Sequence, residues 1–119
     1  MNTSLKTIIS ILAFFALASF VPSPPKTEKV VIKTKIYCDH CKVCESCEPR
    51  IVTAVEELQG VISATLDVEK EEITVWYKPK KTNAEAIRNS IINCGFAADN
   101  LPPNPEAYER LDGCCKKVE

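Results

Sequence analysis

The hydrophobic pattern between residues 29 and 101 switches between two periods, and the order of the switches constrains the fold more than any other feature. Lys29 to Ile36 alternates apolar and polar residues and is rich in β-branched side chains, which predicts a strand. A stripe at helical spacing follows a cysteine-rich loop and ends at Gly60. At its start, Ser46 is a candidate N-cap and Pro49 suits the first helical turn.

The second half of this region repeats the pattern. Alternation over residues 61–68 and 73–77 predicts two more strands, joined by a turn at residues 69–71. Thr82-Asn83-Ala84-Glu85 is a capping-box pattern before a second helical stripe, and Phe96 to Leu101 predicts a last edge strand. The order strand, helix, strand, strand, helix, strand predicts an α+β sandwich, in which two helices cover one face of a four-stranded antiparallel sheet.

The first 18 residues predict a cleavable signal peptide. Lys6 precedes an almost wholly apolar segment of about 14 residues, Ile8 to Val21, and Ala16-Leu17-Ala18 offers small residues for cleavage. The segment is shorter than the roughly 20 residues that span a bilayer; an uncleaved membrane anchor is the alternative. We therefore expect a periplasmic or secreted protein. The expected parts are a signal peptide at 1–18, a linker at 19–28, one domain at 29–101 and a cysteine-containing tail at 102–119.

Four cysteines recur at a spacing of three directly before the first predicted helix: Cys38, Cys41, Cys44 and Cys47, within the run CDHCKVCESC. Soft thiolate sulfur binds Cu(I), Zn(II), Cd(II) and Hg(II), so the run predicts a metal-binding loop. Disulfides are the alternative in an exported protein. A bridge inside this run would close a very small loop and remove little entropy from the unfolded chain, and the total of seven cysteines is odd.

Three motifs together resemble the heavy-metal-associated domain: Cys44-Glu45-Ser46-Cys47 before a helix, Gly60-Val61 after it, and Gly95-Phe96 after the second helix. That family includes small copper chaperones, N-terminal modules of metal-pumping P-type ATPases and the periplasmic mercury-binding protein of mercury-resistance systems. The resemblance covers Lys29 to Leu101. It implies a ferredoxin-like βαββαβ fold that binds one soft metal ion through Cys44 and Cys47 and passes it to a partner.

The loop departs from the family pattern in two ways. The family usually has Gly-Met where this chain has Cys41 and Lys42, and the segment from Tyr37 to Cys41 is inserted after the first strand. Cys38 and Cys41 are therefore candidates to assist the family pair, to close a four-thiolate site, or to hold a second ion or a small Cu(I) cluster. His40 lies between them and is a further candidate ligand; an ordinary surface histidine is the alternative.

Four residues outside the loop are also candidates for the site. In the ferredoxin-like fold the loop after the second helix lies beside the metal loop, so Cys94 and Phe96 are expected to border the ion. Phe96 would shield it from water, and Cys94 would be a core residue or a ligand. Adjacent Cys114 and Cys115 form a second soft-ligand patch, which would capture or relay an ion, or bridge back to the first two cysteines of the loop. A tail without a metal role is the alternative.

These features predict an exported metallochaperone, not an enzyme. It would capture Cu(I), Hg(II) or a similar ion at Cys44 and Cys47 and pass it to a membrane transporter by thiolate exchange, as a monomer or a metal-bridged dimer. A thiol–disulfide redox protein and a sink that holds several ions are the alternatives. A net charge of −1 gives no basis for nucleic-acid binding, and with three glycines in the chain a nucleotide-binding loop is not expected.

Overall fold

The computed structural model describes residues 20–23, 26–37 and 47–117. Its strands are β1 (Glu28–Lys33), β2 (Val61–Asp67) and β3 (Glu72–Tyr77). Its helices are α2 (Cys47–Glu56), α3 (Ala84–Asn93), α4 (Pro105–Glu109) and a 3-10 turn, η1 (Gly113–Cys115). The predicted signal peptide lies outside the described residues. Within the described part, no helix is long and apolar enough to cross a membrane.

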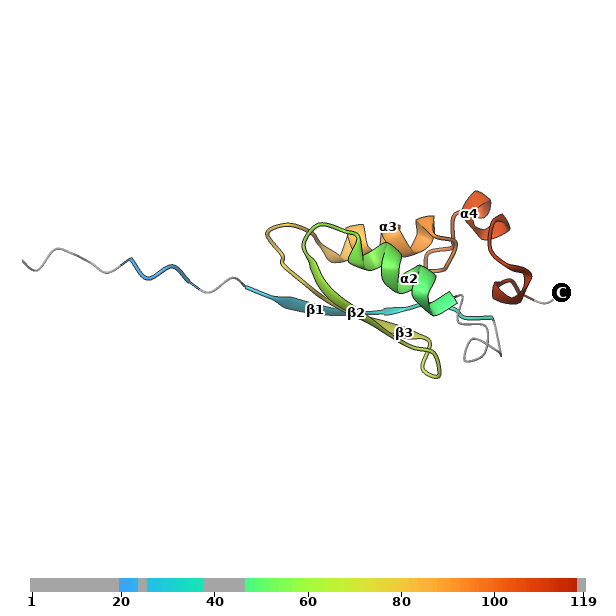
Figure 1. Ribbon diagram of the computed structural model, residues 1–119, viewed down its shortest axis with the longest axis horizontal. Coiled ribbons are helices and arrows are strands. Elements are labelled where there is room, and N and C mark those ends of the chain that lie inside the picture. The colour runs from blue at the N-terminus through green and yellow to red at the C-terminus, as the bar shows by residue number, and fades with distance from the viewer. Residues whose placement is uncertain (1–19, 24–25, 38–46, 118–119) are drawn as a thin grey trace, which may run out of the picture.

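The three strands form one antiparallel sheet in the order β1-β3-β2. Helices α2 and α3 lie together on one face of this sheet, as Figure 1 shows. The alternation in the strands explains this arrangement, because every second side chain points toward the helices. The predicted α+β class is therefore confirmed, with β3 in the centre of the sheet.

The core lies between the sheet and the two helices. Its fully buried side chains are mainly β-branched residues of the strands and the apolar stripes of the helices, in keeping with the two predicted periods. They include Ile32, Ile51, Val55, Ile73, Val75, Ile87 and Ile91. Strand β1 ends at Lys33, three residues before the predicted strand end at Ile36. Ile36 is nevertheless buried in the same cluster.

The segment from Phe96 to Leu101 is a turn, where a fourth strand was expected. Within the described residues it has a single bridge, between Ala98 and Leu101, and Asp99 adopts a positive φ of 53° that a regular strand does not allow. The segment nevertheless lies beside β1. The Asp99 amide donates to the Lys33 carbonyl at 2.7 Å, and the Lys33 amide donates to the Asp99 carboxylate at 3.0 Å.

The N-cap of α3 is Asn83, one residue after Thr82, the first residue of the predicted capping box. The Asn83 side chain accepts a hydrogen bond from the Ala86 amide at 2.8 Å and so satisfies one of the free N–H groups at the start of α3. Asparagine is at least as good a cap as threonine, which explains why Thr82 does not take this position. The candidate cap of α2, Ser46, lies outside the described residues.

The C-terminal tail folds back against the core at the end of the sheet where β1 ends and α2 begins (Figure 1). Part of the tail is helical as α4, and the Asn104 side chain caps this helix by accepting from the Glu106 and Ala107 amides. The Asn104 amide donates to the Ile92 carbonyl at 3.1 Å, which attaches the tail to the end of α3. Leu111 is buried with the core.

Gly95 allows this close approach of the tail. Its φ is +104°, and a Cβ at this position would lie 2.9 Å from the Ala107 carbonyl oxygen. We therefore expect Gly95→Ala to lower the free energy of unfolding by about 1–3 kcal/mol, because it adds backbone strain and a clash with α4. Urea unfolding of the oxidised protein measures this change.

Gly113→Ala is the matched control. A Cβ at Gly113 meets no atom within 4 Å, so the variant should lie within about 0.5 kcal/mol of the wild type. Equal stability of the two variants would contradict the role assigned to Gly95.

Candidate functional site

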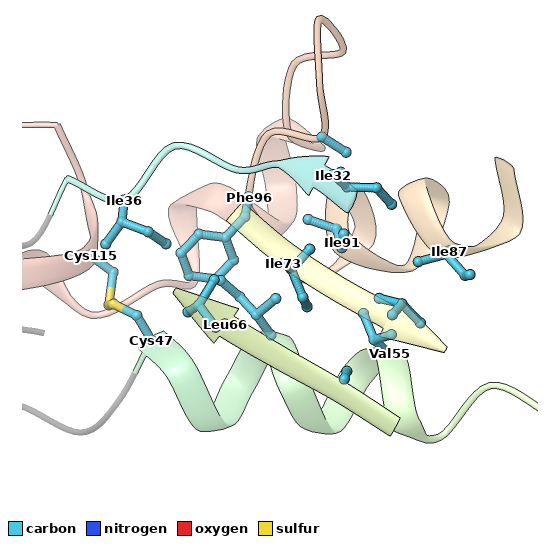
Figure 2. Close-up of a cluster of buried hydrophobic side chains, with 14 of the residues drawn as sticks. Ile32, Ile36, Cys47, Val55, Leu66, Ile73, Ile87, Ile91, Phe96 and Cys115 are labelled. Carbon is cyan, nitrogen blue, oxygen red and sulfur yellow. A yellow bond between two sulfur atoms is a disulfide. The ribbon is translucent and has the colours of Figure 1, made fainter. Parts of the chain in front are cut away.

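A disulfide between Cys47 and Cys115 closes one end of the core. It joins the first residue of α2 to the last residue of η1, across 68 positions in the sequence, with the two Cα atoms 6.4 Å apart. Both residues are 1% exposed, so the sulfurs are almost wholly shielded from solvent. Figure 2 shows the disulfide at one end of the hydrophobic cluster.

Local structure explains why each cysteine points inward. Cys47, Ile51 and Val55 follow one another at intervals of four residues, and all three lie on the buried face of α2. Cys115 follows Ala107 and Leu111 at the same spacing, and these three tail residues are also buried. The Cys115 amide donates to the Asp112 carbonyl at 2.8 Å, which fixes the turn that presents its side chain.

Apolar side chains surround the disulfide. Ile36, Leu66 and Phe96 belong to the same buried cluster as the two cysteines, and Figure 2 places Phe96 between the disulfide and the centre of the core. Phe96 is 3% exposed. It therefore lies in the neighbourhood of Cys47 that the resemblance implied; its role in keeping water from a bound ion stays a prediction.

A pocket lies beside Cys115. The end of β1, the loop after α3 and the tail contribute its walls, which are mainly apolar and aromatic with two lysines at the rim. The lining residues are Lys35, Tyr37, Gly95, Phe96, Ala97, Pro103, Tyr108, Cys115 and Lys117. The Lys117 amide donates to the Tyr108 hydroxyl at 2.8 Å, a contact between two residues of the tail itself.

Cys94 lies in a different environment. It is the C-cap of α3, its thiol donates to the Ile91 carbonyl at 3.1 Å, and it lines a hollow between α2 and α3. Burial raises the pKa of this thiol to about 11, although the positive charge of Arg50 opposes the rise. Cys94 is therefore protonated at neutral pH, and a metal ion would have to displace that proton.

The structure brings together two of the cysteines proposed for the site, Cys47 and Cys115. One of the options for the tail was a bridge back to Cys38 or Cys41; in the structure the disulfide partner of Cys115 is Cys47. Cys114 is exposed at the surface beside this disulfide. Four further candidates lie outside the described residues: Cys38, His40, Cys41 and Cys44. Across the described ranges, no three His, Cys, Asp or Glu side chains form a group that could hold a metal ion.

Known proteins resemble this chain over its central region. Residues 43–97 match the family model of the heavy-metal-associated domain. The Copper-exporting P-type ATPase of Staphylococcus epidermidis is 36% identical over 56 residues, 47% of this chain and 7% of that protein. Copper-transporting ATPase 1 of Rattus norvegicus is 32% identical over 76 residues, 64% of this chain and 5% of that protein. This chain thus spans a small part of either ATPase.

A short relative is covered almost completely. The Copper chaperone CopZ of Staphylococcus haemolyticus is 28% identical over 68 residues, which are 57% of this chain and 91% of the chaperone. Oxidized MerP from Ralstonia metallidurans CH34 superimposes with a TM-score of 0.54 at 16% identity, covering 62% of this chain and 96% of that one. A CopZ metallochaperone superimposes with a TM-score of 0.51 at 19% identity, covering 60% of this chain and 98% of that one. These two structures confirm the ferredoxin-like fold.

The disulfide should contribute to the stability of the oxidised protein. It restricts the unfolded chain across 68 residues, so we expect Cys115→Ser to lower the free energy of unfolding by about 2–4 kcal/mol. Urea unfolding without reductant measures this difference. In the presence of a dithiol reductant the wild type and the variant should unfold at similar urea concentrations; a difference that persists unchanged would contradict the assignment.

The raised pKa of Cys94 predicts its reactivity. Because the thiolate is the nucleophile, alkylation of Cys94 by iodoacetamide should keep accelerating up to a pH of about 11. A synthetic peptide of residues 90–98 is the control, and its rate should level off near the ordinary pKa of 9.0. Peptide-resolved mass spectrometry gives both rates, and a common plateau would show that the fold does not raise the pKa.

Proposed function

Since residues 43–97 form a heavy-metal-associated domain, we propose that this protein binds a soft metal ion and carries it to a membrane transporter. Cys44 and Cys47 are the family pair, and Cys38 and Cys41 assist them. The observation that carries the proposal is the position of Cys47. It is the first residue of α2, where free backbone N–H groups and the helix dipole stabilise a thiolate.

The first ion to test is Cu(I). Thiolate ligands suit Cu(I), Hg(II), Zn(II) and Cd(II) alike, so the chemistry of the cysteines does not choose among them. The names of three similar proteins refer to copper: a copper-exporting ATPase, a copper-transporting ATPase and a copper chaperone. We take these names as the reason to place Cu(I) before the other ions.

Transfer would proceed by stepwise thiolate exchange. An incoming thiolate of the partner bonds to the ion before one of the carrier's sulfurs leaves, so the ion is never released to water. The partner is a metal-transporting membrane protein with its own thiolate site. This role needs binding and handover and no bond-making chemistry on a substrate, so we propose a carrier and not an enzyme.

Two features support export to the periplasm or the cell exterior. The sequence begins with the pattern of a signal peptide, Lys6 followed by the apolar segment Ile8 to Val21. The Cys47–Cys115 disulfide is the form expected in an oxidising compartment. Reduction of this disulfide would precede any metal binding through Cys47, because a sulfur in a disulfide carries no thiolate charge.

The disulfide also favours a second candidate function, a thiol–disulfide redox protein. Such a protein must present a sulfur to the disulfide of its substrate. Cys47 and Cys115 are each 1% exposed, which leaves little access for a substrate protein. An insulin-reduction assay distinguishes the two functions: turnover would favour the redox protein, and none is expected of the carrier.

Native mass spectrometry tests the carrier. The reduced full chain would be titrated anaerobically with Cu(I), Hg(II) and Zn(II) against a competing chelator. We expect one ion per chain, and an affinity that falls about 100-fold or more when Cys44 and Cys47 are both replaced by Ser, since even groups that only support a metal ligand contribute about 10- to 100-fold.

Cys94→Ser is the control, because the Cys94 thiol is protonated at neutral pH and lies in another hollow. This variant should bind as the wild type does. Undiminished binding by the double variant would refute the carrier built on Cys44 and Cys47. Two or more ions that survive the double substitution would indicate a metal sink instead.

A further inference from the structure

We propose that Cys115 is a metal ligand in its own right: in the reduced protein the C-terminal tail supplies a further thiolate to the ion that Cys47 binds. This inference rests on the proposed function and extends it to a segment that lies beyond the matched domain, which ends at residue 97. The ligand class is a soft, thiophilic metal ion that two converging sulfurs can hold.

The first support is the convergence of the two side chains. The Cα atoms of Cys47 and Cys115 are 6.4 Å apart and both sulfurs point into the same buried space (Figure 2). Each metal–sulfur bond is about 2.3 Å long for Zn(II), so two sulfurs on one ion lie about 4 Å apart. Side-chain rotation alone can open the pair to that separation.

The second support is that the tail is held in place without the disulfide. Leu111 is buried in the core, and the Asn104 amide bonds to the Ile92 carbonyl at 3.1 Å. Gly95 allows α4 to approach closely, as described above. Arg50 of α2 lies 3.8 Å from the Asp112 carboxylate, a weaker exposed ion pair. Reduction would therefore leave the two sulfurs near each other, and the tail would not have to find its site again.

The third support is the charge around the pair. Each thiolate brings one negative charge, so two or more thiolates on Cu(I) form an anionic complex. The start of α2 carries the positive end of its helix dipole, and Lys117 lines the pocket beside Cys115. Lys35 lines the same pocket, but its ammonium group is already paired with the Glu71 carboxylate at 3.0 Å. The helix dipole and Lys117 compensate the charge of a thiolate complex, and the buried apolar surroundings exclude water that would otherwise compete for the ion.

Reduction converts the closed form into the binding form. A dithiol reductant attacks the S–S bond; its own two sulfurs become a disulfide, and two electrons and two protons pass to Cys47 and Cys115. The ion then forms two metal–sulfur bonds and displaces both thiol protons. Oxidised and metal-bound forms are therefore mutually exclusive at this pair.

Metal affinity of the reduced full chain tests the proposal, with Cu(I) supplied from a chromophoric chelator and Cd(II) as a second probe. We expect Cys115→Ser to weaken binding about 10- to 100-fold and to reduce the thiolate-to-Cd(II) charge-transfer absorption. Cys114→Ser removes the neighbouring, exposed thiol and is the matched control; it should bind as the wild type does. Equal binding by the two variants would overturn the proposal.

Alkylation gives an independent readout. In the reduced wild type, bound Cu(I) should protect Cys115 from iodoacetamide, and Cys47→Ser should abolish this protection. Protection that is independent of Cys47 would also overturn the proposal. Circular dichroism and urea unfolding of each variant under reducing conditions verify that all of them are folded.

The same set of variants separates the two proposals. If Cys47→Ser, alone or together with Cys44→Ser, leaves binding unchanged, the carrier itself is wrong. If Cys47→Ser abolishes binding while Cys115→Ser does not affect it, the carrier stands and Cys115 serves only as the disulfide partner.

Discussion

The bond between Cys47 and Cys115 is the constraint on which the site end of the molecule depends. It ties the first turn of α2 to a tail that is otherwise attached through Leu111 and the end of α3. Because both sulfurs are buried, the bond is part of the core and not a surface staple. Cys47 is also one of the two cysteines proposed to bind the metal ion, so under that proposal the disulfide and the ion compete for one sulfur.

The tail distinguishes this chain from the domain that it carries. The family match ends at residue 97, and α4 and η1 come after it. These added elements do not extend the sheet; they cover the end of the core at which α2 begins (Figure 1). A small domain has little core of its own, so an added apolar segment and a disulfide both contribute a substantial fraction of its stability.

Much of the fold could be predicted because its signals are local. Alternation placed all three strands and helical spacing placed α2 and α3, to within a few residues at their ends. The fourth strand was the error, since its apolar residues are consistent with a strand but Asp99 takes a positive φ and bonds to Lys33. For the site, the sequence named Cys47, Phe96 and Cys115 as candidates but not the pairing of the two cysteines.

The amino-acid sequence by itself determined the order of the elements and the candidate thiol ligands, because periodicity and the spacing of thiols are properties of short segments. One signal for the tail was also present: Ala107, Leu111 and Cys115 recur every four residues, the spacing of a buried helical face. The tertiary structure decided which sulfurs meet. Cys47 and Cys115 are separated by 68 positions, and they become neighbours only because α4 packs against Gly95 and the end of α3.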